Sequence, residues 1–183
     1  MTVKKATLRK NTDGKKARIL AFTIAKGGQL KSTSAVNIAG AILKDEQVAN
    51  KKVCIIDLDA QANVFTAFGL EADMLSENED LSAALLGYSN ADGEQMSGLA
   101  AIKNALFELY NDGENTIDCI SSNERCDLLE MTILTNLETF TSPTTLLRDV
   151  CSVLEDYYDY IIIDTPPAYS LIVSNVFMVD RVE

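Results

Sequence analysis

Residues 26–33 of the chain read Lys26-Gly27-Gly28-Gln29-Leu30-Lys31-Ser32-Thr33. An apolar run at residues 18–24 precedes this stretch, and residues 32–44 follow it with apolar side chains at helical spacing. The stretch therefore joins a predicted buried strand to a predicted helix, which is where a phosphate-binding loop belongs. Glycine lets backbone N–H groups approach an anion closely, and a helix start adds partial positive charge. We expect Lys31 to neutralise phosphate oxygens and the Ser32 hydroxyl to coordinate magnesium.

Two further apolar runs end at acidic residues, one at Asp57 and one at Asp164. Both runs are typical of buried parallel strands. A helix with Ser142 as its N-cap is predicted over residues 143–156, leading into the strand before Asp164, and another helical piece is predicted over residues 99–110. The alternation of strands and helices predicts an α/β fold with a doubly wound, mostly parallel sheet, whose ligands bind at the carboxyl ends of the strands.

Three segments, taken in order, resemble the motifs of the ParA/MinD family of ATPases. Residues 26–33 are similar to the family's deviant Walker A loop, Lys-Gly-Gly-x-Gly-Lys-Ser/Thr, which has an additional early lysine. Residues 57–63, Asp-Leu-Asp-Ala-Gln-Ala-Asn, resemble its Asp-x-Asp-x-Gln-x-Asn segment, and residues 162–167, Ile-Ile-Asp-Thr-Pro-Pro, resemble its Walker B strand. The resemblance implies a P-loop NTPase fold of the deviant Walker A class over residues 17–183, incomplete at the C-terminus because the last third of a family member has no counterpart.

The resemblance also implies a site for ATP and Mg²⁺. Lys26 is then the signature lysine, which reaches across a nucleotide-sandwich dimer to the phosphates of the partner subunit, and residues 27–33 form the nucleotide loop. Asp59 orients the attacking water, while Asp57 and Asp164 lie near the metal. Taken singly, a glycine pair also fits a plain turn, and an aspartate also fits a strand end or a helix cap. Because the chain has no histidine, any catalysis must use Lys, Asp or Glu.

The function that the resemblance implies is an ATP-dependent dimerisation switch in plasmid or chromosome partition, with a ParB-like adaptor as partner. Relatives with the same fold have other tasks. A MinD-like membrane-cycling switch would need a C-terminal amphipathic helix, and a tyrosine autokinase of capsule synthesis would need a tyrosine-rich tail; the chain has neither. A sheet edge left open by the absent strand would also invite pairing with another chain.

Leu30 departs from the family pattern, which has glycine at this position. A side chain on a left-handed backbone costs roughly 1–2 kcal/mol, so we expect weaker ATP binding than in the family. A complete loss of nucleotide binding would leave a scaffold that binds partners through the same fold. This interaction module is the alternative function, and it puts ATP hydrolysis in question.

Composition limits the partners of the chain. It has 16 Lys and Arg against 27 Asp and Glu, a net charge of −11 that repels a phosphate backbone. DNA contact is therefore not expected from this acidic portion. The basic residues of positions 1–16 are interpreted as a flexible tail before the domain at 17–183. No apolar stretch is long enough to cross a bilayer, so a cytoplasmic protein without a membrane role is expected.

Overall fold

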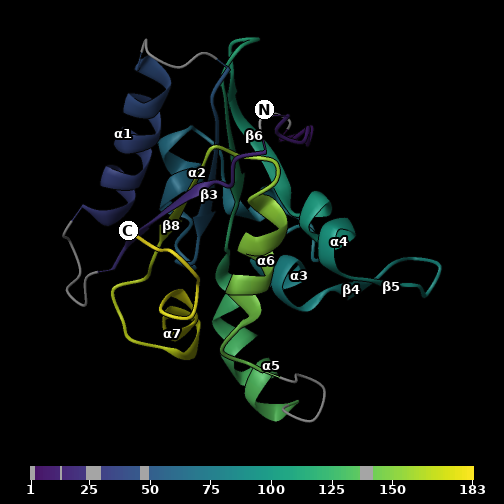
Figure 1. Cartoon of the computed structure of the whole chain (residues 1–183). Coiled ribbons are helices and arrows are strands. Elements are labelled where there is room, and N and C mark those ends of the chain that lie inside the picture. The colour runs from purple at the N-terminus through teal and green to yellow at the C-terminus, as the bar shows by residue number, and fades with distance from the viewer. Residues whose placement is uncertain (1–2, 13, 24–29, 46–49, 137–141) are drawn as a thin grey trace.

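The computed structural model describes residues 3–12, 14–23, 30–45, 50–136 and 142–183. A six-stranded sheet forms the centre of the molecule, and a small hairpin stands away from it (Figure 1). The main sheet consists, in spatial order, of β1 (Lys4–Lys5), β6 (Leu106–Asn111), β7 (Thr116–Ile120), β3 (Lys52–Asp57), β8 (Tyr160–Asp164) and β2 (Arg18–Phe22). The hairpin consists of β4 (Tyr88–Ser89) and β5 (Gln95–Met96).

Helices cover both faces of the main sheet. The α-helices are α1 (Lys31–Lys44), α2 (Asn63–Ala67), α3 (Leu81–Leu86), α4 (Gly98–Asn104), α5 (Leu129–Thr135), α6 (Leu146–Leu154) and α7 (Leu171–Val176). Two short 3-10 helices are η1 (Ala72–Met74) and η2 (Glu124–Leu128). Within the described ranges, no helix combines the length and apolar character needed to span a membrane.

The central strands run parallel. β3 pairs in parallel with β7 and β8, and β8 pairs in parallel with β2, whereas β6 runs antiparallel to β7 and β1. Parallel neighbours need a long crossover, and α1 provides it between β2 and β3, which lie on either side of β8. The prediction of a doubly wound, mostly parallel sheet is confirmed.

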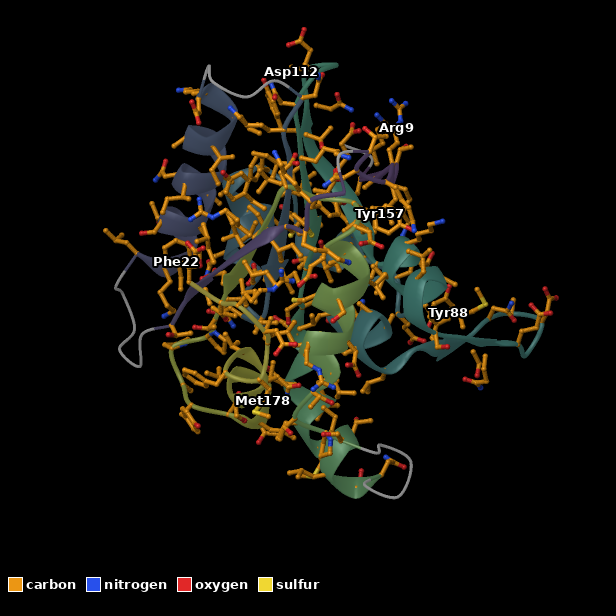
Figure 2. All side chains as sticks on the ribbon, viewed as in Figure 1. Arg9, Phe22, Tyr88, Asp112, Tyr157 and Met178 are labelled. Atoms are coloured by element: carbon orange, nitrogen blue, oxygen red, sulfur yellow. The ribbon has the colours of Figure 1, made fainter. Side chains whose placement is uncertain are left out.

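Alternate residues of the central strands fill two apolar cores, one on each face of the sheet. Val53 and Ile55 of β3 belong to the core under α1 and α2, whereas Cys54 and Ile56 belong to the core under α6 and α7. This division follows from the two-residue period of a strand. Figure 1 shows α1 and α6 on opposite sides of the sheet, and Figure 2 shows side chains filling the space between them.

Helix α1 confirms the helix predicted after the phosphate-loop sequence. It begins at Lys31 and buries Ala35 and Ala39 completely against the sheet. Small side chains at these positions let the helix backbone lie close to the strands. Lys44 stands in the last turn, where a positive charge suits the negative end of the helix dipole.

Helix α6 begins later than predicted, and Ser142 is not its N-cap. The N-cap residue is Thr145, whose side chain makes no capping hydrogen bond. The side chain of Asn175 on α7 instead accepts a hydrogen bond from the N–H of Leu147 at 3.3 Å and donates one to the carbonyl of Pro143 at 3.0 Å. A contact from another helix therefore replaces the local cap on which the prediction depended.

The helix predicted over residues 99–110 is wrong in its second half. Helix α4 ends at Asn104, and the following residues form β6, in which Leu106 pairs with Ile120 and Phe107 pairs with Cys119. A short apolar run fits a helix or a strand equally well by periodicity. Pairing with β7 decides the outcome, and such a contact is not visible in the local sequence.

Part of the basic front segment lies along the sheet. Lys4 is paired with Glu108 in the register of β1 and β6, and its Nζ lies 2.6 Å from Glu108 Oε1. The Nζ of Lys5 lies 2.9 Å from Glu79 Oε1 and stands over the ring of Phe107. Both lysines therefore form ion pairs with glutamates of the domain that follows them in the chain.

Candidate functional site

A cavity of about 660 Å³ lies at the carboxyl ends of the parallel strands. Its walls come from the start of α1, the turn after β3, helix α2 and the segment after β8. The lining residues are Leu30, Lys31, Ser32, Thr33, Val36, Asn37, Asp59, Gln61, Asn63, Thr66, Ala67 and Pro167. The cavity therefore occupies the place that a doubly wound sheet offers to a ligand.

The structure brings most of the predicted site residues together. Residues 30–33 and Asp59 line the cavity. Asp57 and Asp164 end the neighbouring strands β3 and β8, where they are direct partners in the parallel register. The remaining predicted positions, Lys26, Gly27, Gly28 and Gln29, lie outside the described residues.

Leu30 is the N-cap residue of α1 and has a left-handed backbone, with φ 56° and ψ 27°. This conformation costs a non-glycine residue roughly 1–2 kcal/mol. Its carbonyl accepts a hydrogen bond from the N–H of Ser34 at 2.7 Å, which begins the helix. The side chain is 67% exposed. The cost of leucine at this position therefore comes from the backbone conformation and not from a steric clash with the core.

Lys31 is the first residue of α1 and is only 9% exposed. A lysine is rarely buried to this degree without an anionic partner. The positive charge of Lys31 lowers the pKa of the nearby Asp164 carboxyl group. Lys31 thus lines the cavity and also acts through its charge on the acidic end of β8.

Asp57 is completely buried, and its two carboxylate oxygens hold the turn that follows β3. Oδ1 accepts a hydrogen bond from the N–H of Asp59 at 3.0 Å, and Oδ2 accepts one from the N–H of Val64 at 3.2 Å. Burial raises the pKa of Asp57 to about 8, and the neighbouring charge of Asp164 adds to the rise. Asp57 thus shapes the turn that carries Asp59.

Asp164 is also completely buried, and neither carboxylate oxygen makes a hydrogen bond of ordinary geometry with the described residues, although the Ser32 hydroxyl and the N–H of Thr165 lie close enough to lower its pKa. Burial raises its pKa to about 6; the Ser32 hydroxyl and Lys31 act in the opposite direction, and the charge of Asp59 adds to the rise. Most buried polar groups in proteins are satisfied, so an unpaired carboxylate needs an explanation. A bound cation would provide one.

The donor set fits magnesium held together with a phosphate ligand. Hydroxyl and carboxylate oxygens, here from Ser32 and Asp164, are the ligands that Mg²⁺ takes from proteins, usually one or two at a time. In the part of the chain that the structure describes, no group of three or more Asp, Glu, Cys or His side chains could hold a metal by itself. Phosphate oxygens and water would therefore complete the coordination.

Several residues of the site received no role from the sequence. Asn63 stands in the motif at 57–63, and this placement was its only signal. Val36, Asn37 and Thr66 line the cavity because α1 and α2 pack together, and nothing in their local sequence indicates a ligand. Ala62 has a left-handed backbone with φ 48°. Nothing in the sequence indicated this conformation, because the residue is not a glycine.

Comparisons with known proteins agree with this geometry. The chain is 30% identical over 165 residues to the sporulation initiation inhibitor protein Soj of Bacillus subtilis, covering 86% of the chain and 53% of Soj. It is 28% identical over 157 residues to a ParA family protein of Mycoplasma pneumoniae, with the same coverage, 86% and 53%. A family model described as an AAA domain matches residues 17–182. The chain belongs to the ParA/MinD-type P-loop ATPases.

Structural comparison shows the same fold. The structure of Cyanothece McdA in complex with ATP is similar to this ParA-type chain with a TM-score of 0.68 and 21% identity, over 92% of the chain and 56% of McdA. The chain spans about half the length of the curated relatives it matches. The family match begins at residue 17 and leaves the segment that contains β1 outside it.

Proposed function

We propose that this chain supplies the ATP-binding portion of a ParA-like switch in plasmid or chromosome partition. The observation that supports the proposal most strongly is the buried carboxylate of Asp164, which lies near Lys31 and Ser32 and makes no hydrogen bond of ordinary geometry with the residues that the structure describes. A magnesium–triphosphate ligand matches this arrangement of charge. The structure of the similar Cyanothece McdA in complex with ATP supports the same nucleotide.

Each residue then has a distinct task. Lys31 neutralises phosphate oxygens, and the backbone N–H groups at the start of α1 bind them. Ser32 and Asp164 would hold magnesium, which would supply neutralisation of the charge on the phosphates. Asp59 orients a water molecule, and Asp57 keeps the turn of Asp59 in place through its hydrogen bonds.

The switch itself is an association of two copies. ATP binding brings the nucleotide faces of two subunits together, and Lys26 reaches the phosphates held by the partner subunit. Hydrolysis separates the subunits, and a ParB-like adaptor acts on the dimer. DNA contact is not assigned to this portion, because its net charge of −11 disfavours it.

Thermal unfolding with and without Mg-ATP tests nucleotide binding. At a ligand concentration about a hundred times the dissociation constant, the free energy of unfolding should rise by roughly 2.7 kcal/mol. Lys31→Ala should lose this gain, whereas Lys103→Ala, a lysine that does not line the cavity, should keep it. A wild-type protein that Mg-ATP does not stabilise would favour the non-catalytic scaffold.

Light scattering tests the dimerisation step separately. The molar mass should increase when Mg-ATP is added, and Lys26→Ala should bind nucleotide while remaining monomeric. Nucleotide binding without any change of mass in the wild-type protein would contradict the switch.

A further inference from the structure

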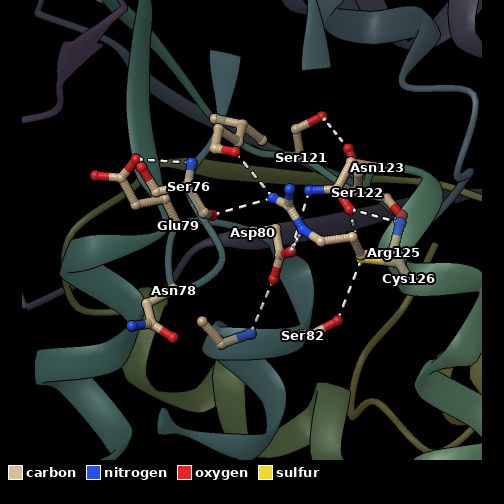
Figure 3. A network of polar contacts seen from close by, with 12 residues as sticks. Ser76, Asn78, Glu79, Asp80, Ser82, Ser121, Ser122, Asn123, Arg125 and Cys126 are labelled. Atoms are coloured by element: carbon tan, nitrogen blue, oxygen red, sulfur yellow. Dashed lines mark hydrogen bonds and ion pairs between the residues drawn. The ribbon is translucent and has the colours of Figure 1, made fainter. Parts of the chain in front are cut away.

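A polar network lies beside the nucleotide cavity, on the side of η2. Asp80 is the N-cap of α3, and it accepts hydrogen bonds from Asn123 Nδ2 at 3.0 Å and from Arg125 Nε at 3.5 Å. Arg125 Nη2 also donates to the carbonyls of Leu75 at 2.9 Å and Ser76 at 3.1 Å. Figure 3 shows the side chains of Asp80 and Arg125 pointing toward one another. One guanidinium group thus joins three segments of the chain.

The core of this network is buried. Asp80 and Asn123 are almost completely buried, and Asn123 Oδ1 accepts a hydrogen bond from the N–H of Arg125 at 2.9 Å. Buried side chains with several hydrogen bonds are held in one geometry. Asn123 therefore fixes the end of the segment that follows β7.

Backbone contacts connect this segment to the nucleotide site. The N–H of Ser122, next to Asn123, donates to the carbonyl of Asp57 at 3.1 Å. The carboxylate of Asp57 in turn holds the N–H groups of Asp59 and Val64. Hydrogen bonds, together with the peptide bond between Ser122 and Asn123 and the side chain of Asp57, thus connect the side chain of Arg125, by way of Asp80, to the turn that carries Asp59.

A second cavity separates the network from that turn. Its volume is about 370 Å³, and Ala60, Gln61 and Thr66 lie on one side of it, with Asn123 and Arg125 on the other. Gln61 and Thr66 also line the nucleotide cavity, so they form the wall between the two spaces. The turn 59–62 consequently has open space on both sides.

The same turn is strained. Ala62 has φ 48° and ψ 43° at the start of α2, a conformation that costs a non-glycine residue roughly 1–2 kcal/mol. Such a conformation persists only where the surrounding contacts hold it. Asp57 accepts hydrogen bonds from the N–H groups on either side of Ala62, those of Asp59 and Val64, and its own carbonyl accepts one from Ser122 in the segment next to Arg125.

We propose that Arg125 is a positioning residue: through Asp80, Asn123, Ser122 and Asp57, its side chain fixes the turn that places Asp59 against the phosphate site. This inference rests on the proposed ATPase function, because it assigns Asp59 a place in that reaction. Arg125 itself does not line the nucleotide cavity. Its removal should therefore affect turnover more than nucleotide affinity.

Amide hydrogen exchange of the purified protein without nucleotide tests the physical link. Arg125→Ala should make the amides of Asp59 and Val64 exchange about tenfold faster. Arg125→Lys keeps a positive charge near Asp80 but cannot reproduce the fork of the guanidinium group, so the exchange rates of these two amides should increase by an intermediate factor. This variant replaces Arg125→Ala in the test if the alanine variant does not fold. Arg148→Ala is the matched control, since the side chain of Arg148 is similarly exposed and pairs with Asp149 on the surface.

Steady-state hydrolysis of Mg-ATP tests the functional link. Arg125→Ala should lower kcat about tenfold and change the Kd of Mg-ATP less than twofold, whereas Arg148→Ala should change neither. Unchanged exchange at Asp59 and Val64 in both Arg125 variants would overturn the inference, and so would faster exchange with an unchanged kcat. If the wild-type protein hydrolyses no ATP, the proposed function fails, and with it the positioning role in catalysis; the exchange rates then decide only whether the link exists.

Discussion

Two buried carboxylates on opposite sides of β3 have different surroundings. Asp118 on β7 is 4% exposed and accepts a hydrogen bond from the hydroxyl of Tyr158 at 2.7 Å, whereas Asp164 on β8 has no such partner among the described residues. Burial is the largest cause that raises both pKa values, to about 7 for Asp118 and to about 6 for Asp164. The comparison teaches that a buried carboxyl group does not by itself indicate a ligand site. A buried carboxyl group without a well-placed hydrogen-bond donor among the described residues is the stronger indication.

Replacing Asp164 tests the contrast most strongly. Asp164→Asn should weaken Mg-ATP binding about a hundredfold, because the proposed site would lose one of its two protein ligands for the metal. The same change should raise the stability of the nucleotide-free protein, because the amide avoids the burial of a charge. Titration calorimetry and thermal unfolding measure the two effects. Unchanged binding together with lower stability would make Asp164 a structural residue.

Replacing Tyr158, the hydrogen-bond partner of Asp118, should lower stability and leave Mg-ATP binding unchanged. Tyr158→Phe removes the donor and leaves a buried carboxyl group unsatisfied, which should lower the free energy of unfolding by about 1–3 kcal/mol. The stabilisation by Mg-ATP should remain, since Tyr158 lies far along the chain from the nucleotide loop and does not line its cavity. Tyr157→Phe is the control, and an equal loss in both variants would show that the hydroxyl of Tyr158 has no special role.

The dependence of stability on pH follows from the same carboxylates. The folded pKa values of Asp57, Asp118 and Asp164 are about 8, 7 and 6, all above the ordinary 3.8. Between pH 4 and pH 8 the folded state therefore binds more protons than the unfolded state, and its free energy of unfolding falls as the pH rises, by at most about 1.4 kcal/mol per pH unit for each group.

Urea unfolding at pH 5, 6, 7 and 8 measures this dependence. In Asp118→Asn, the free energy of unfolding should fall less steeply with pH up to about pH 7. The fall that remains should come from Asp57 and Asp164. Saturating Mg-ATP should also reduce the decline, because a bound cation favours ionised Asp164. A nucleotide-free protein whose stability increases from pH 5 to pH 8 would contradict the raised pKa values.

Leu30→Gly should have the smallest effect. Glycine removes a backbone strain of roughly 1–2 kcal/mol but increases the entropy of the unfolded chain, so we expect a net gain of at most about 1 kcal/mol in stability. Mg-ATP should also bind several-fold more tightly. Ordinary tight binding by the wild-type protein, with no change in Leu30→Gly, would mean that the leucine is harmless in this loop.

The sequence predicted the parts of the fold that local patterns control. The apolar runs before Asp57 and Asp164 correspond to β3 and β8, and the helical spacing after Lys31 corresponds to α1. Strand β6 was mistaken for the end of a helix, because only its pairing with β7 distinguishes the two. β1 was not foreseen either, since two lysines show no strand pattern until Glu108 lies beside them.

The site divides in the same way. Ordered motifs indicated Lys31, Ser32 and the aspartates, since each follows a strand or begins a helix. Asp80 and Arg125 had no such signal. They stand 45 residues apart, and their contact exists only after β7 and α3 have packed. Polar networks of this kind depend on tertiary structure, and a single sequence does not reveal them.

The pairing of Asp57 with Asp164 across β3 and β8 has a consequence for folding. Side chains alternate between the two faces of a strand, so a slip of one residue between these strands would send one carboxyl group to the opposite face. Only the native alignment brings both carboxyl groups to the same edge of the sheet, so under the proposed function Mg-ATP would stabilise correctly aligned chains alone.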